Sequence, residues 1–417
     1  MTSATVPRSR VREPKSGYRW TILGTAFLVQ AMYTLLQQGI PILTPFFHSW
    51  FNLSLAGVGA LVSCFNAGLT ISSFPSGALV DRIGERWAVT GGSVIACALV
   101  VGTLLVQQSL VLMGVLLFVA GLLSGSVSIS SGKAVFGWFD QRERGLAMGI
   151  RQIAIPAGAA IGAISLPLLG ALGGWQLGLA ITGSVQLVAA LVFLSTLRDP
   201  PSGPPPAGRA VLPALLDVIH DRDLLLTALV SMLMVLAQYV FLAYLILYLT
   251  GEGLATLTAS AALLLVQLGA VAGRAVWGRL SDRRFHGARR PVIARLAVLA
   301  SLMVASLAAT SAGWPLWLIY LQMALLGGTA LSWNGLAVTL MAELGGYHRA
   351  GAAIGLNSTA VYFGALIGAP IFGAIVDASH SYQAAWLALA FGSLAALIPL
   401  AYIREPSQPR SAALITP

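Results

Sequence analysis

The sequence predicts an all-α membrane protein with twelve transmembrane helices in two pseudo-symmetric six-helix bundles. Hydrophobic residues make up 57% of its 417 residues and charged residues only 9%, whereas a soluble domain carries about 25% charged residues. Apolar runs of about 20 residues, the length that crosses the hydrocarbon core as a helix, recur along the chain. A polar, proline-rich stretch near the middle separates six of these runs from the other six.

Each run is continuous rather than alternating, which argues against membrane-spanning strands. Because lipid offers no hydrogen-bond partners to the backbone, the runs are expected to be helices. The first run follows a basic segment but is too long for the apolar part of a signal peptide. The predicted spans are 20–46, 55–79, 88–106, 110–137, 146–170, 176–197, 223–249, 257–280, 292–311, 316–341, 351–376 and 384–403.

The proline-rich stretch sets the predicted domain organisation. Its five clustered prolines cannot continue a helix. We therefore expect a cytoplasmic N-terminal tail at 1–19, a first bundle at 20–197, a cytoplasmic linker at 198–222, a second bundle at 223–403 and a cytoplasmic C-terminal tail at 404–417.

The basic residues predict the orientation. If both termini are cytoplasmic, 22 of the 24 Lys and Arg residues fall in the tails and in the loops or loop margins on the cytoplasmic side, as the positive-inside rule requires. This asymmetry indicates a multi-pass protein of the cell inner (plasma) membrane. It also explains the net charge of +10 without nucleic-acid binding, which we do not expect.

Matching elements occur at equivalent places in the two halves. The loop after the second span reads Gly-Ala-Leu-Val-Asp-Arg-Ile-Gly-Glu-Arg at 77–86, and the loop after the eighth reads Gly-Arg-Leu-Ser-Asp-Arg at 278–283. The first resembles the signature of the major facilitator superfamily, and the second resembles its degenerate repeat. The pattern Trp-Phe-x-x-Arg-x-Arg-Gly at 138–145 fits as well, and the resemblance covers about 20–403.

This resemblance implies a transporter whose substrate site lies between the bundles near the membrane midplane. It also implies that charged loop residues hold the cytoplasmic side closed in one state, although these charges could instead only orient the loops. The residues that would form this gate are Gly77, Asp81, Arg82, Arg86, Asp282 and Arg283.

Two arginines, Arg151 and Arg274, lie deeper inside predicted spans than the basic residues at the span margins. A guanidinium in the membrane is costly and usually faces a cavity or a partner, although both side chains could instead extend to the interface. Arg274 stands four residues before Gly278, similar to the substrate-binding arginine of monocarboxylate transporters and oxalate/formate exchangers, which pairs with a carboxylate. The acidic partner of those transporters is Ala270 here, so proton coupling and substrate identity do not carry over.

No acidic residue lies near the centre of a predicted span, and the histidines lie in loops or at span ends. The predicted cavity is therefore net positive, which favours an anionic substrate. Other polar or aromatic residues near mid-span are candidates for the same site, or they only bridge helices. These are Gln267, Gln152, Asn357, Tyr362, Tyr33, Gln37, Asn66, Trp333 and Asn334.

The leading hypothesis is a secondary active transporter that moves a small organic anion, a carboxylate, by alternating access. Drug or metabolite efflux by proton antiport is the alternative, weakened because the first span has no acid and Pro156 has no preceding glycine. A non-transporting membrane sensor is a third possibility. We expect a monomer in the lipid bilayer, with no enzymatic activity, cofactor or metal.

Overall fold

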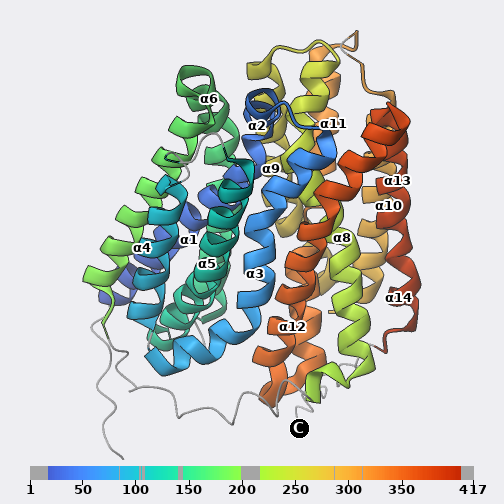
Figure 1. The fold of residues 1–417 in the computed structure, drawn as a ribbon. Coiled ribbons are helices and arrows are strands. Elements are labelled where there is room, and N and C mark those ends of the chain that lie inside the picture. The colour runs from blue at the N-terminus through green and yellow to red at the C-terminus, as the bar shows by residue number, and fades with distance from the viewer. Residues whose placement is uncertain are drawn as a thin grey trace, which may run out of the picture.

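A computed structural model describes residues 17–83, 85–102, 105, 109–139, 144–198, 217–285, 287–311 and 313–404, and these form helices and short connections without a strand (Figure 1). The first half contains α1 (Tyr18–Ile42), α2 (Thr44–Phe51), α3 (Leu55–Ile83), α4 (Glu85–Gly102), α5 (Leu110–Trp138) and α6 (Arg144–Thr196). The second half contains α8 (Arg222–Gly251), α9 (Thr256–Arg284), α10 (Arg290–Ser306), the 3₁₀ turn η2 (Leu307–Ala309), α11 (Leu316–Ala330), α12 (Asn334–Ser379), α13 (Tyr382–Ala395) and α14 (Leu397–Tyr402).

Among the described residues, nine helical stretches are long and apolar enough to cross a membrane, or ten if the bent pair α1–α2 is one span. Helix α6 contains two crossings, because Gly173 and Gly174 leave the helical conformation and Gly174 has a φ of +67° that favours glycine. Helix α4 is a shorter apolar helix. Starting from ten, the second crossing of α6 and the crossing of α4 bring the total among the described residues to twelve. This total agrees with the twelve predicted spans.

Two predicted spans are not continuous helices. The span predicted at 20–46 bends by 44° where α1 gives way to α2, because Pro41 and Pro45 lack the N–H groups that a straight helix requires. The span predicted at 316–341 is interrupted between Ala330 and Asn334. Here the Ser332 hydroxyl donates to Gly327 O at 3.3 Å, which satisfies a carbonyl near the helix end.

The helices form two groups that meet along the middle of the molecule. In Figure 1, α4, α5 and α6 lie on the left, α8, α10, α13 and α14 lie on the right, and α3 runs beside α12 between them. Contacts between the two halves come mainly from α3 with α12, α6 with α9, and α1 with α8. We call the end where α1 begins and α14 ends the lower end, and the opposite end, where α3 begins, the upper end (Figure 1).

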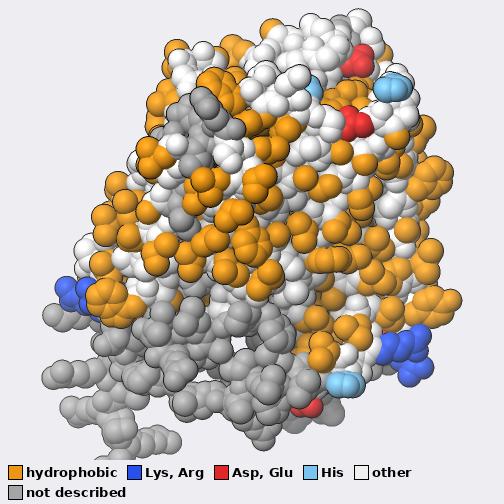
Figure 2. All heavy atoms as spheres, viewed as in Figure 1, with side chains coloured by type: hydrophobic (Ala, Val, Ile, Leu, Met, Phe, Trp, Pro, Cys, Tyr) orange, Lys and Arg blue, Asp and Glu red, His pale blue; other side chains and the backbone are white. Residues whose placement is uncertain are grey.

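The outer surface suits a lipid environment. Figure 2 shows hydrophobic side chains over the middle height of the molecule, with charged side chains towards the two ends. Large apolar side chains such as Leu105, Val111 and Leu172 are 77% to 89% exposed. In water an apolar surface of this extent would be costly, whereas in a bilayer it contacts acyl chains.

Candidate functional site

Arg274 lies on the buried face of α9, seven residues after Gln267, so that the two side chains project from the same side of the helix. Its Nη2 donates a long hydrogen bond of 3.5 Å to Leu331 O, at the interruption between α11 and α12. Its Nε is buried and has no acceptor among the described residues. The guanidinium is thus held beside a helix break with donors left unsatisfied.

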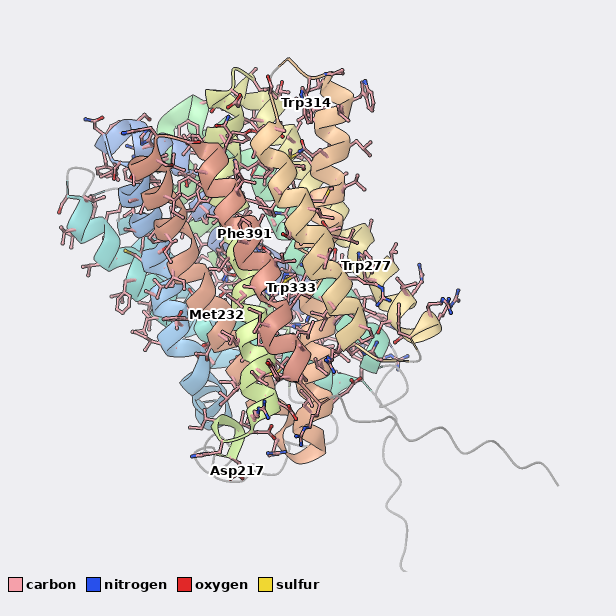
Figure 3. The ribbon with its side chains drawn as sticks, turned by 90° about the vertical axis from the view of Figure 1, so that its right-hand side faces the viewer. Asp217, Met232, Trp277, Trp314, Trp333 and Phe391 are labelled. Carbon is pink, nitrogen blue, oxygen red and sulfur yellow. The ribbon has the colours of Figure 1, made fainter. Side chains whose placement is uncertain are left out.

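Two further buried donors lie on the segments around Arg274: Gln267 on the same helix, and Trp333 beside the helix break that Arg274 contacts. Gln267 is 3% exposed and Trp333 is fully buried, and the structure shows no acceptor for Gln267 Nε2 or Trp333 Nε1 in the part of the chain it describes. Trp333 is two residues after Leu331, whose carbonyl accepts the hydrogen bond from Arg274. Figure 3 shows Trp333 at mid-height, between Trp314 near one end and Asp217 at the other. This region therefore has an excess of buried donors, which an anion would satisfy.

Arg151 has a different environment, because its guanidinium is already hydrogen-bonded. It is 4% exposed, and its Nη2 donates to Gln30 Oε1 and Ser131 Oγ, both at 2.9 Å. The same nitrogen contacts the carbonyl and the hydroxyl of Ser128. All these partners are neutral. Arg151 therefore links α6 to α1 and α5 inside the first bundle, a role that the sequence did not reveal.

A cluster of tyrosines and one glutamine lies where the bundles meet. Gln37 Nε2 of α1 donates to the hydroxyl of Tyr239 in α8 at 3.0 Å. The Tyr362 side chain of α12 interacts with Tyr33 and Gln37 of α1, and it lies near the Arg151 guanidinium. The predicted residues Tyr33, Gln37 and Tyr362 are thus brought together, and with Tyr239 they connect both halves.

The remaining predicted ligands differ in burial. Asn66 and Asn357 are each 2% exposed, and neither side-chain oxygen has a partner among the described residues. Asn334 is partly exposed at the first turn of α12, and Gln152 is exposed. The structure does not bring Gln152 into the buried polar set, because it follows Arg151 by one residue and projects from a different side of α6.

At the upper end the bundles are joined by a contact that the sequence analysis missed. The Asp377 carboxylate, at the end of α12, accepts hydrogen bonds from Leu55 N at 3.1 Å and Ala56 N at 2.8 Å, at the start of α3. The Tyr244 hydroxyl donates to Leu55 O at 2.7 Å. A Cβ on Gly373 would lie 2.5 Å from the backbone of Leu55. The two halves are therefore in direct backbone contact at this end.

The predicted gate at the lower end is described only in part. Arg86 and Arg283 are exposed. Asp282 accepts from Arg289 Nη1 at 2.6 Å, and Arg289 also approaches Glu343 at 3.5 Å. These partners all belong to the second half, so the described contacts do not join the halves. The side chains of Gly77, Asp81 and Arg82 lie outside the described residues.

Some of the missed residues had a signal in the sequence. Gln30 precedes Gln37 by seven residues and Tyr33 by three, which places the three side chains on one face of α1. Ser128 and Ser131 lie in a serine-rich part of α5, a pattern that also suits helix packing. Asp377 follows an apolar span as any loop acid does, so its contact with α3 had no sequence signal.

The comparisons with known proteins agree with this architecture. The family described as Major Facilitator Superfamily matches residues 23–369. The chain belongs to this superfamily. An uncharacterised MFS-type transporter of Mycobacterium tuberculosis is 31% identical over 94% of this chain and 87% of its own length.

Two more distant matches are a named transporter and a solved structure. Monocarboxylate transporter 3 of Rattus norvegicus is 26% identical over 90% of this chain and 78% of its own. The crystal structure of a D-xylose–proton symporter matches with a TM-score of 0.73 at 19% identity, over 93% of this chain and 99% of the symporter. The last similarity concerns the fold alone, and it places this major facilitator transporter among carriers with the same helix arrangement.

Proposed function

We propose that this major facilitator transporter carries a small organic anion, a carboxylate, by alternating access, and that Arg274 binds the anion. One observation carries the proposal: in the described part of the chain, the Arg274 guanidinium inside the second bundle has a buried Nε without an acceptor and a single long hydrogen bond. Among the described residues neither Arg274 nor Arg151 forms an ion pair with a carboxylate.

A carboxylate matches the geometry of an arginine side chain. Its two oxygens accept two parallel N–H bonds from one guanidinium, which is the strongest common form of charge-assisted hydrogen bond. An unpaired charge away from water is costly, so a bound carboxylate would remove a cost that the empty site carries. The buried N–H groups of Gln267 and Trp333 add donors to the same region, and the oxygens of a carboxylate could accept from them.

Arg151 has an indirect role in this proposal. Its hydrogen bonds to α1 and α5 hold a positive charge near Tyr362, where the bundles meet. This charge favours an anion in the cavity without direct contact. Tyr33, Gln37 and Tyr362 would then separate the cavity from the upper end.

The relatives support the same substrate class. The similarity to monocarboxylate transporter 3 extends over 90% of this chain. The segment around Arg274 also resembles the corresponding segment of monocarboxylate transporters. Arg274 is the residue in it that would bind the carboxylate. Energy coupling would come from exchange of one anion for another, or from a proton carried with the substrate. In this proposal the lower end, with both termini, faces the cytoplasm of an inner membrane, and the transporter acts as a monomer.

The test measures carboxylate binding by purified protein. We expect one or more carboxylates in a panel of organic acids, inorganic anions and lipophilic cations to raise the melting temperature. Arg274→Gln should weaken that binding by about 30-fold or more, because a buried charge pair loses one partner. Arg279→Gln, which changes an exposed arginine five residues further along α9, is the matched control and should bind normally.

Uptake by proteoliposomes distinguishes the remaining possibilities. Labelled carboxylate should accumulate with the wild type and with Arg279→Gln, and it should not accumulate with Arg274→Gln. Wild-type binding retained by Arg274→Gln would overturn the proposed site. Stabilisation by lipophilic cations alone would favour efflux, and binding without accumulation would favour a sensor.

A further inference from the structure

A groove lies on the outer face of the second bundle at the lower end, away from the substrate site. It has a volume of about 910 Å³ and is formed by the first half of α10, the residue Ala288 before it, and the start of α14. Eight described residues line it, and none of them is acidic. They are Ala288, Arg290, Pro291, Ala294, Arg295, Val298, Leu299 and Leu397.

The lining changes from basic to apolar along α10. Arg290 is the first residue of the helix, and Arg295 lies about 7.5 Å further along at 1.5 Å per residue. Val298 and Leu299 follow, 39% and 36% exposed, and Leu397 of α14 completes the apolar wall. Positive charge therefore lies at the membrane boundary, and exposed hydrocarbon lies deeper, in the direction of the membrane interior.

The two guanidinium groups are held in place by the protein. Arg290 Nη2 donates to Ala401 O at 2.6 Å, which connects the start of α10 to the end of α14. Arg295 Nη1 donates to Pro291 O at 2.8 Å, and its guanidinium carbon lies 4.4 Å from the centre of the Phe285 ring. These contacts direct Arg295 back towards the lower end. A guanidinium has five N–H donors, and among the described residues Arg295 makes one hydrogen bond, so it is able to bind a second acceptor.

We propose that this groove binds an anionic phospholipid of the lower leaflet. The lipid phosphate would lie against Arg290 and Arg295, and one acyl chain would lie along Val298, Leu299 and Leu397. Charge complementarity supports a phosphate, because the charged residues in the described part of the lining, Arg290 and Arg295, are both basic. The exposed apolar wall supports a lipid rather than a soluble phosphate, since a soluble ion would leave the wall uncovered. Basic pockets between transmembrane helices on the cytoplasmic side are suited to such headgroups.

The site does not depend on the proposed substrate. It lies on α10 and α14, whereas Arg274 lies on α9 and contacts the break between α11 and α12. A bound lipid would bridge α10 and α14 at the same place as the Arg290 contact with Ala401. The expected consequence is a more stable outer edge of the second bundle when anionic lipid is present.

The test uses native mass spectrometry of the full-length protein in detergent, titrated with phosphatidylglycerol or with phosphatidylcholine of the same acyl chains. We expect a phosphatidylglycerol adduct that survives at concentrations where phosphatidylcholine does not bind. Arg290→Gln with Arg295→Gln should weaken phosphatidylglycerol binding by about 30-fold, and Arg295→Gln alone by about fivefold. Arg279→Gln, outside the groove, is the matched control.

Two further measurements keep the proposal falsifiable if the double variant is unstable. Leu299→Trp fills the apolar part and leaves both arginines, so it should also weaken lipid binding. Arg274→Gln should keep the wild-type lipid preference, which separates this site from the substrate site. Wild-type preference for phosphatidylglycerol in both Arg295→Gln and Leu299→Trp would overturn the proposal. So would full competition by glycerol 3-phosphate, which would indicate a site for soluble anions.

Discussion

The contact between Asp377 and the start of α3 leads to the most specific prediction about alternating access. The carboxylate belongs to the second half and caps a helix of the first, with one oxygen on Leu55 N and the other on Ala56 N. The upper end cannot open without breaking both bonds. Removing the negative charge should therefore favour a state in which this end is open.

The size of the effect follows from the geometry. Each hydrogen bond to a charged group contributes about 1.5 to 3 kcal/mol, and a negative charge at a helix N-terminus adds a few tenths to 1 kcal/mol. In Asp377→Asn one amide oxygen still accepts, but the NH₂ group faces the second N–H and cannot accept from it. A loss of about 2 kcal/mol is expected, which changes the ratio of open to closed molecules about 30-fold.

Distances between spin labels measure this ratio. Labels on cysteines placed at Ser49 and Leu257 report the separation of the two halves at the upper end, after replacement of the natural Cys64 and Cys97. Both labelled positions are exposed in the structure. Asp377→Asn should add or enlarge a long-distance population in double electron–electron resonance measurements.

Asp221 provides the control, because its carboxylate also caps a helix. It accepts from Asp223 N at 3.1 Å and Leu224 N at 3.3 Å, at the start of its own helix α8. Asp221→Asn should lower stability and leave the label distances unchanged, since no contact between the halves is lost. If Asp377→Asn has the same distance distribution as the wild type, the carboxylate does not hold the upper end closed and the reasoning fails.

Three other predictions concern the same architecture. Arg151→Gln should lower the free energy of unfolding by about 2 kcal/mol because it removes several hydrogen bonds to a charged group, whereas Arg274→Gln should not lower it. Thermal melts in detergent compare the two variants. Equal losses of stability would contradict the distinction between the two arginines. Gly373→Val should open the upper end more than Asp377→Asn does, because the added Cβ meets backbone at 2.5 Å; an unchanged label distance would exclude this. Tyr244→Phe removes the hydroxyl that donates to the backbone of α3 and should enlarge the long-distance population by about fivefold. A wild-type distance distribution would show that this hydroxyl is not needed to hold the upper end closed.

Much of the fold was predictable because bilayer thickness and backbone pairing act on each span separately. The span predicted at 110–137 is α5, whose start is fixed locally, since the Ser109 hydroxyl accepts from Leu112 N at 3.3 Å. The interruption of the span predicted at 316–341 was not predictable, because it depends on contacts with α9. A Cβ on Gly327 would lie 1.8 Å from Val266 O, so the two backbones touch at a place that the sequence of neither helix specifies.

The candidate site was predictable only as a set of residue types. The sequence shows two arginines inside predicted spans and no acid near the centre of a span, and both arginines remained candidates for substrate contact. Their difference depends on partners far away in the chain. Arg151 donates to Gln30 and Ser131, while within the described part of the chain Arg274 donates to a single backbone carbonyl. Hydrogen-bond partners of this kind follow from helix packing, which a single sequence leaves undetermined.

The contrast between two sites supports the proposal that an anion from outside the protein binds Arg274. At the upper end, the free N–H groups at the start of α3 receive a carboxylate from the same chain, Asp377. At Arg274, inside the second bundle, the described residues supply no such carboxylate, and the neighbouring buried donors are left open as well. A permanent internal acid there would hold the guanidinium in every state of the cycle. A transported acid would satisfy it only while bound, so the same group can accept the substrate from one side of the membrane and release it on the other.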